Sequence, residues 1–267
     1  AGTGGFSNYG SSVGAFDSAV IDAIITFFMV LFGINFALFY RVLVGGWRDA
    51  LRSEELHWYL ALFAGSTLFV SLMILPQYGT FLNALRYGSF QVATIMSTTG
   101  YATADFNLWP QAVKALIVVL MFIGSCAGST AGGIKVVRVG ILCKLGCREV
   151  RRTFQPRKVQ VVRFEGKGVE ENRLTQVSAF FFVYVLLVLA GMFLVSLEGL
   201  YDLETNFTAV LTCISNVGPG LGHVGPVENF SGYGPFAKVV LSLLMLAGRL
   251  ELFPILVLFH PSAWRKG

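Results

Sequence analysis

The chain has 267 residues, of which 55% are hydrophobic and only 13% charged, with a mean hydropathy of +0.68 and a formal net charge of +5. A soluble globule of this length needs more polar surface, so the composition excludes that class and indicates a membrane protein. The four cysteines lack the spacing of a zinc site and are interpreted as free thiols.

Five apolar blocks predict five membrane-spanning helices. A hydrocarbon core about 30 Å thick needs roughly 20 apolar residues in a helix, and each block approaches that length. Only the last block contains charges, Arg249 and Glu251. In chain order the blocks are 23–40, 58–75, 115–134, 174–197 and 239–259.

Basic residues set the predicted orientation. The connection 135–173 carries eleven Lys and Arg residues against four acids, and the connection after the first block and the carboxy end are basic too. By the positive-inside rule these segments are cytoplasmic, and the connections 76–110 and 198–235 face outward. Topology alone accounts for the basic connection, so we expect no nucleic-acid partner.

Both outward connections have the same internal plan. A short, mildly apolar stretch (81–96, then 204–212) precedes a polar, glycine-bearing loop, and the chain then enters the next block. Segment 1–7 resembles the end of the same plan, which aligns Gly5, Gly100 and Gly218. A stretch too short to span, followed by a polar return, is typical of a re-entrant segment, and such backbone must line a wet cavity or lie buried in protein. We therefore expect re-entrant helices with loops that line a pore.

The chemistry of these loops favours a monovalent cation. Thr98, Thr99, Ser215 and Asn216 offer oxygens, and the glycines allow backbone carbonyls to turn toward an axis. The carboxyl end of a short preceding helix carries partial negative charge directed at the same place. The loops hold no ionisable side chain, so anion and proton pathways are disfavoured.

The glycine-rich run 124–133 admits two interpretations. Gly124, Gly128 and Gly132 form G-x-x-x-G pairs that would let helices approach closely. Alternatively the helix breaks here, since so many glycines with Ser129 and Thr130 are poor helix formers. We favour the break, which would lie below the middle loop and could obstruct the path.

Two further features concern function. Arg249 is an intramembrane charge and is expected to face a cavity or the bundle interior. No Ser/His/Asp or Cys/His constellation recurs, so the sequence predicts a transporter and not an enzyme. A secondary carrier built from inverted repeats is the alternative, but these copies share one orientation.

Four segments together resemble the superfamily of Trk, Ktr and HKT potassium transporters, and within it the bacterial TrkH membrane subunits. The segments are 97–110, 124–135, 215–220 and 248–251. The resemblance covers essentially the whole chain. It implies an all-α membrane protein of pseudo-symmetric repeats, each made of a helix, a re-entrant pore helix with a filter loop, and a second helix.

The resemblance also implies a division of the chain and a set of site residues. Residues 1–57 would hold the filter and second helix of repeat two, 58–173 repeat three with its basic cytoplasmic loop, and 174–267 repeat four, so we expect this chain to be the carboxy-terminal portion of a larger protein. The ion-binding filter residues would be Thr3, Gly4, Gly5, Thr98, Thr99, Gly100, Asn216, Val217 and Gly218. The intramembrane gate would comprise Gly124, Gly128, Ser129, Thr130, Gly132, Gly133, Lys135 and Arg249.

The expected cargo is K⁺, which the resemblance implies is bound at the filter residues of a multi-pass protein in the bacterial inner membrane. The expected partners are the lipid bilayer, a second copy in a homodimer, and a cytoplasmic ring of TrkA-like nucleotide-binding regulatory subunits. The last filter reads Asn216-Val217-Gly218, without the Thr-Thr of the middle one. This departure leaves a less selective Na⁺/K⁺ pathway as an alternative.

Overall fold

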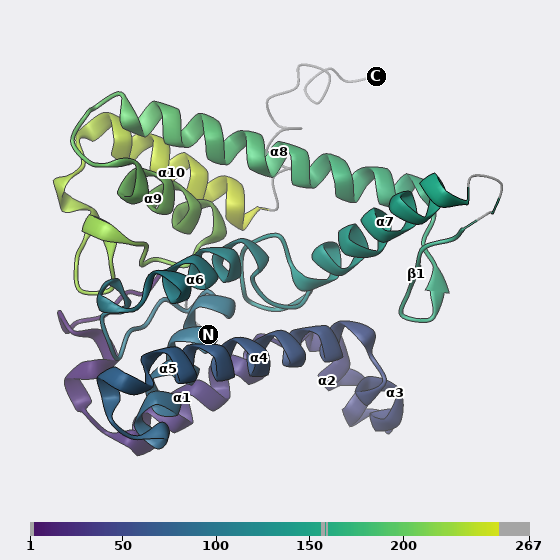
Figure 1. The fold of residues 1–267 in the computed structure, drawn as a ribbon, viewed down its shortest axis with the longest axis horizontal. Coiled ribbons are helices and arrows are strands. Elements are labelled where there is room, and N and C mark those ends of the chain that lie inside the picture. Colours follow the sequence, from purple (N-terminus) through teal and green to yellow (C-terminus); the bar gives the residue numbers. More distant parts are fainter. Residues whose placement is uncertain (1–2, 156–157, 159, 251–267) are drawn as a thin grey trace.

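The computed structural model describes residues 3–155, 158 and 160–250 of the chain. Nearly all regular structure is helical, as the sequence predicted. Figure 1 shows the long helices running side by side, with the short helices α5 and α9 toward one end and α7 with a small β-hairpin at the other. The re-entrant segments therefore share one side of the molecule, and the basic connection occupies the opposite side.

The first apolar block is not one continuous helix, which corrects the prediction for 23–40. Helix α1 (Ala19–Phe32) and helix α2 (Phe36–Leu43) are separated at Gly33–Asn35 and meet at an angle of 88°. The Asn35 side chain caps α2 by accepting a hydrogen bond from Ala37 N at 2.9 Å. A short 3₁₀ turn (Ser12–Phe16) precedes α1, and the short helix α3 (Trp47–Leu51) follows α2.

A long helix comes next, followed by a shorter one at the stretch expected to be re-entrant. Helix α4 (Glu54–Tyr78) begins at the N-cap Ser53, and α5 (Phe81–Met96) begins at the N-cap Thr80, whose hydroxyl accepts from Asn83 N. The chain turns between them at Gly79, where φ is +73°. A 3₁₀ turn at Phe106–Leu108 leads from the loop after α5 to the next helix.

The third apolar block breaks in its middle, as the composition favoured. Helix α6 (Gln111–Ile123) ends before Gly124, and α7 (Val136–Phe154) starts after Lys135. Residues 124–135 are non-helical, so the G-x-x-x-G interpretation is wrong. Beyond α7, strands β1 (Arg163–Phe164) and β2 (Lys167–Gly168) form an antiparallel hairpin.

The chain after the hairpin follows the same plan as α4 to α6. Helix α8 (Glu171–Ser196) is long, α9 (Leu203–Ser215) is short and re-entrant, and α10 (Pro235–Arg249) begins with Pro at its first turn, where a missing N–H costs nothing. Two 3₁₀ turns, Gly222–Val224 and Phe230–Gly232, connect α9 to α10. The part of the fifth predicted block beyond Arg249 lies outside the described residues.

The distribution of apolar side chains fits a lipid environment. Helices α5 and α9 are almost wholly buried toward their carboxyl ends, whereas the long outer helices expose large side chains such as Phe27, Phe182 and Phe193, each more than 60% accessible. Helices α4 and α8 are long and apolar enough to span a membrane, and α1 with α2 would count as a third span. The total of five spans stays a prediction.

Candidate functional site

The three glycine-bearing loops meet at one place, although they are far apart in the sequence. Gly5 N donates to Thr99 O at 2.9 Å, which joins the first loop to the second. A Cβ on Gly5 would lie 2.6 Å from Gly100 O, and one on Gly218 would lie 2.5 Å from Gly4 O. All three aligned glycines have positive φ, so any side chain would be strained there as well as crowded. Glycine is therefore required where the loops converge.

The loops after α5 and α9 have the same backbone geometry despite different sequences. Thr98 and Asn216, each two residues before the filter glycine, both adopt left-handed φ values of +54° and +58°. In the loop after α5, Thr99 N donates to Thr94 O at 2.9 Å. In the loop after α9, the equivalent bond runs from Val217 N to Thr212 O, also at 2.9 Å. This shared bonding supports the alignment of the two loops as copies of one unit.

The side chains proposed as ligands make hydrogen bonds within the protein. Thr98 Oγ1 accepts from Gly132 N at 3.0 Å, and the Thr99 and Ser97 hydroxyls bond each other at 2.7 Å. Ser215 Oγ pairs with Tyr184 OH at 2.7 Å. The Asn216 amide donates to two carbonyls, Cys213 O and Met245 O. Backbone carbonyls are consequently the groups through which these loops can bind a dehydrated cation.

The filter region is tied together at its outer edge by residues that sequence reasoning did not single out. Ala102 N donates to Ser12 Oγ, and Gly14 N to Ala102 O. The Asn107 side chain forms two reciprocal bonds with the backbone of Gly222, at 3.0 and 3.1 Å. Each of these two sets of hydrogen bonds links the stretches of chain that follow consecutive glycine-bearing loops. Ala102 and Asn107 lie inside the segment 97–110 that resembles the transporter family, whereas Ser12 and Gly14 lie outside all four resembling segments.

The outer ends of the pore helices are anchored by charged groups. Arg86 of α5 donates to Asp22 of α1 at 2.7 Å, and Asp22 is buried. Asp202 caps α9 by accepting from Thr205 N at 3.3 Å, and this hydrogen bond holds the pKa of the Asp202 carboxyl below its ordinary value. With their amino ends fixed in this way, α5 and α9 direct their partially negative carboxyl ends at the converging loops.

The non-helical loop 124–135 lies directly beneath the filter loops. Its two ends are held together by bonds from Ile134 N to Phe122 O at 3.0 Å and from Val136 N to Ser125 O at 2.9 Å. Ser125 Oγ donates to Met96 O at 2.6 Å, at the end of α5. Gly132 is pressed against Ser215 O so closely that a Cβ has no room. The break therefore forms a defined loop packed onto both pore helices.

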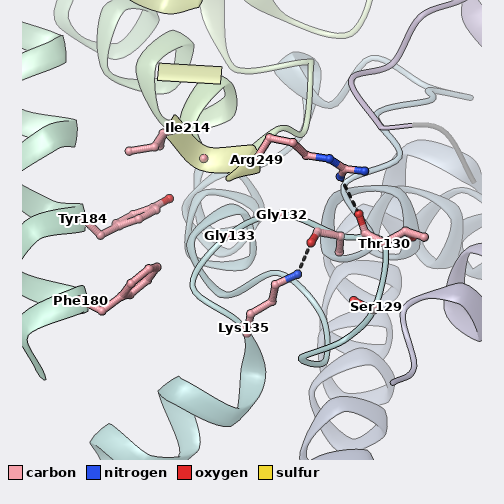
Figure 2. A pocket seen from close by; sticks show the side chains of 11 residues that line it. Ser129, Thr130, Gly132, Gly133, Lys135, Phe180, Tyr184, Ile214 and Arg249 are labelled. Atoms are coloured by element: carbon pink, nitrogen blue, oxygen red, sulfur yellow. Dashed lines mark hydrogen bonds between the residues drawn. The ribbon is translucent and has the colours of Figure 1, made fainter. Parts of the chain in front are cut away.

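Two cationic side chains donate hydrogen bonds to backbone carbonyls of this loop. Figure 2 shows Arg249 directed at the carbonyl of Thr130, with an Nη1–O distance of 2.9 Å. Lys135 Nζ donates to the carbonyl of Ala131. Lys135 is 6% accessible. Arg249 is the last residue of α10, and its side chain lines the cavity beside this loop. Both side chains place positive charge against the loop 124–135.

Cavities flank the loop. One of about 130 Å³ lies between loop residues 129–133, Lys135, the α8 side chains Phe180 and Tyr184, and Arg249 (Figure 2). A second, of about 210 Å³, lies between α1 and residues Ser97, Thr99 and Tyr101 of the loop after α5, and Thr130 lines both. Each is large enough for several waters and has polar groups to hold them. The predicted gate residues thus separate two spaces that can be wet.

The predicted site residues fall into two adjoining groups. Gly4 and Gly5 approach the loops that hold Thr98 to Gly100 and Asn216 to Gly218, and Thr3 directly precedes them in the chain. The predicted gate residues share the loop 124–135 or contact it. Sequence reasoning missed Ser125, Tyr184 and Met245, which position the two groups, because such contacts join distant segments and leave no local pattern.

Comparison with known proteins agrees with this geometry. The family described as TrkH, cation transport protein, matches residues 82–266. The chain is 37% identical to the "Trk system potassium uptake protein TrkH" of Salmonella typhimurium and 35% identical to that of Escherichia coli, over 98% of this chain and 54% of each relative. It is 33% identical to the "Trk system potassium uptake protein TrkI" of Halomonas elongata.

A solved structure matches the fold as well. The crystal structure of the potassium transporter TrkH from Vibrio parahaemolyticus superposes with a TM-score of 0.88 at 33% identity, covering 98% of this chain and 56% of that one. The chain thus spans about half the length of the relatives that it matches. With a family match over most of its length and the same fold, the chain belongs to the TrkH family of cation transport proteins.

Proposed function

We propose that this chain supplies three filter loops and the gate of the potassium-conducting subunit of a Trk-type uptake system in the bacterial inner membrane. The observation that carries the proposal is the convergence of three loops through Gly5, Gly100 and Gly218, all with positive φ and in backbone contact. Carbonyl groups of residues 3–5, 98–100 and 216–218 would replace the hydration shell of K⁺. The names of the relatives, each a potassium uptake protein, support K⁺ as the cargo.

The gate in this proposal is the loop 124–135. In the position described, it packs against the ends of both pore helices, and Lys135 and Arg249 fix it through carbonyls at Ala131 and Thr130. A cation leaving the filter would meet backbone, then two positive charges. Withdrawal of the loop would connect the filter with the cavities beneath it and so open the path.

The proposed assembly includes a fourth filter loop, a second copy of the subunit and a cytoplasmic ring of TrkA-like nucleotide-binding subunits. Three loops that surround one point at near-equivalent positions suit a four-loop filter, as the resemblance implies. The basic face of α7 and the hairpin 163–168 lie at the end of the molecule opposite the filter, which is the side available to a regulatory ring (Figure 1).

The test is ion flux through the complete protein in liposomes. We expect rubidium to move down its gradient in potassium-loaded vesicles, with much slower sodium flux. Deleting residues 128–132 removes the part of the loop that contacts both the filter and Arg249, and we expect it to raise basal flux. Carriage of an organic solute without ion flux would contradict the pore, and unchanged flux in a well-folded deletion variant would contradict the gate.

A further inference from the structure

Glu55 is a buried acid that the pore mechanism described above does not use. It is the second residue of α4 and only 6% accessible. Acidic residues in the first turn of a helix usually interact with their own helix end. Glu55 instead accepts a hydrogen bond from Ala127 N at 2.6 Å, across 72 positions of sequence. Since a buried carboxylate is costly without such partners, this contact is a specific feature of the gate loop.

The same contact lies where the two helix breaks of the molecule meet. Cys126 N donates to Gly33 O at 3.1 Å, and Phe36 N donates to Gly128 O at 3.2 Å. Backbone groups that lack a helical partner at the α1–α2 break therefore bond backbone groups of the gate loop. The Glu55 carboxylate bonds Ala127, which lies between Cys126 and Gly128 in that loop.

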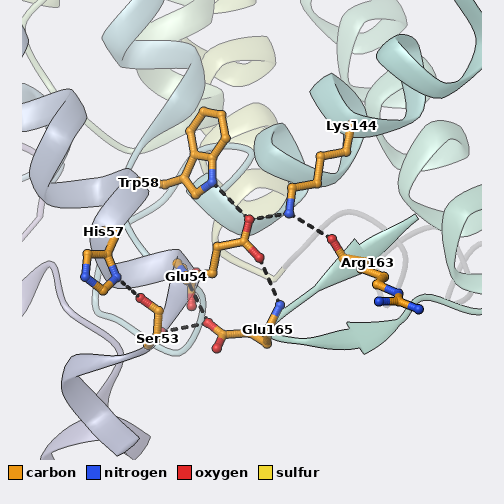
Figure 3. A network of polar contacts seen from close by, with 8 residues as sticks. Ser53, Glu54, His57, Trp58, Lys144, Arg163 and Glu165 are labelled. Carbon is orange, nitrogen blue, oxygen red and sulfur yellow. Dashed lines mark hydrogen bonds and ion pairs between the residues drawn. The ribbon is translucent and has the colours of Figure 1, made fainter. Parts of the chain in front are cut away.

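On its other side Glu55 is linked to the cytoplasmic hairpin. Glu165, at the turn between β1 and β2, accepts from Glu55 N at 3.0 Å and from Ser53 Oγ at 2.7 Å. Its own backbone N–H donates to Glu54 Oε2 at 3.1 Å. Figure 3 shows the adjoining contacts, in which Lys144 of α7 reaches both the Glu54 carboxylate and, at 2.8 Å, Arg163 O.

The hairpin is in turn packed onto α7 and α8. Val162 and Phe164 share a small apolar cluster with Ile141 of α7 and Leu174 of α8. A continuous series of contacts thus runs from the cytoplasmic end of the molecule to Glu165, then to the first turn of α4, and through the Glu55 side chain to Ala127 in the gate loop.

We propose that Glu55 is a positioning residue that holds the gate loop in its closed place against the α1–α2 break and transmits movement of the hairpin 163–168 to the loop. The proposal rests on the proposed function in that it treats the loop 124–135 as the gate. Displacement of Glu165 would pull on the backbone of the first turn of α4 and draw the Glu55 carboxylate away from Ala127. The loop would then lose a charge-assisted bond and open more readily.

Cys126 provides a direct reporter of the loop. It is fully buried and precedes Ala127, whereas Cys143 and Cys147 are exposed and serve as internal standards. In the complete protein in liposomes, the rate at which N-ethylmaleimide labels Cys126 is measured by mass spectrometry of its peptide. Glu55→Ala is expected to speed labelling about tenfold, because loss of a buried bond shifts local opening by that order. Basal rubidium flux should rise with it.

Matched variants separate the bond from general damage. Glu55→Gln keeps an oxygen for Ala127 N, so labelling should stay within about threefold of the parent rate. Glu55→Asp keeps the charge but is too short to reach, so it should label faster than Glu55→Gln; it also replaces Glu55→Ala if that variant does not fold. Glu165→Ala should increase labelling, while Glu171→Ala, which removes a surface partner of Arg148, should not.

The outcomes decide the two proposals separately. Parent-like Cys126 labelling in Glu55→Ala and Glu55→Asp would overturn the role of Glu55, whatever the flux. Parent-like labelling in Glu165→Ala would overturn transmission from the hairpin. If neither the parent protein nor any variant conducts rubidium, the proposed function fails. The labelling rates would still decide whether Glu55 positions the loop.

Discussion

The filter loops after α5 and α9 share one backbone scheme but are attached to different neighbours. Thr98 and Asn216 occupy equivalent left-handed positions. Thr98 accepts a bond from Gly132 in the gate loop, whereas the Asn216 amide donates to Met245 O in α10. The backbone geometry of the two loops is thus the same where the ion would bind, whereas the side chains at the equivalent position bond different segments. At this position the loop after α5 is bonded directly to the proposed gate loop, and the loop after α9 is bonded to α10.

The same contrast holds at the outer ends of the two pore helices. The α5 anchor is an ion pair to another helix, from Arg86 to the buried Asp22 of α1. The α9 anchor is local, because Asp202 caps its own helix and Asn206 bonds Tyr233 in the following connection. Helix α5 is therefore integrated with its neighbours at both ends, whereas α9 is secured largely within its own repeat.

The largest expected effect tests what the two loops share. Gly100→Ser and Gly218→Ser each place a Cβ at positive φ against the backbone of a neighbouring loop. A strain of about 2 kcal/mol would be relieved by moving carbonyls, so we expect a roughly 30-fold loss of preference for potassium over sodium. Paired rubidium and sodium flux measures it. Gly199→Ala, at a turn with open space, is the control. Retained selectivity in both Ser variants would contradict the filter assignment.

An intermediate effect is expected where the loops differ. Thr98→Val removes the acceptor for Gly132 N without changing side-chain size, and a buried unpaired N–H costs about 1–3 kcal/mol. We expect basal rubidium flux to rise roughly tenfold. Thr98→Ser keeps the hydroxyl and should stay near the parent. Asn216→Thr should alter the ratio of sodium flux to potassium flux and leave basal rubidium flux near the parent value. An equal rise in basal flux from substitutions at both positions would contradict the difference between the loops.

The smallest effect concerns the local anchor of α9. Loss of the Asp202 cap in Asp202→Ala should lower the melting temperature by about 1–2 °C, as expected for an exposed cap. Because the pKa of Asp202 is held below its ordinary value, the carboxylate contributes stability above about pH 4, and this is lost as the pH falls through the lowered pKa. Melting curves at several pH values test this. Asp202→Asn should cap independently of pH, and a pH-independent difference between parent and Asp202→Ala would contradict the assignment.

Much of the architecture was predictable, because it follows from composition over short windows. The re-entrant helix at 81–96 coincides with α5, and the glycines of 124–133 predicted the break that separates α6 from α7. The bend at Gly33–Asn35 was missed, since a single glycine in an apolar run is compatible with a continuous helix. What interrupts the helix is tertiary, namely bonds from the gate loop to Gly33 O and from Phe36 N.

The site was predictable to the level of backbone and not of side chains. Glycines at matching positions of the repeated plan identify where backbones approach closely, and the structure brings those glycines together. The partners of Thr98, Ser215 and Asn216 could not be inferred, because each bond joins segments whose adjacency depends on the complete fold. Glu55 likewise looks like an ordinary first-turn acid until its position beside Ala127 is known.

The length of α6 has an electrical consequence. Its residues Gln111–Ile123 extend about 20 Å, about two thirds of a hydrocarbon core of about 30 Å. If wet cavities conduct the potential up to the gate loop, most of the transmembrane voltage falls across the few ångströms that this loop occupies. Lys135 at one end of the loop and Arg249 against its middle lie in that narrow region. A full elementary charge crossing 100 mV is worth about 2.3 kcal/mol, so even a short displacement of the loop would do work against the membrane potential.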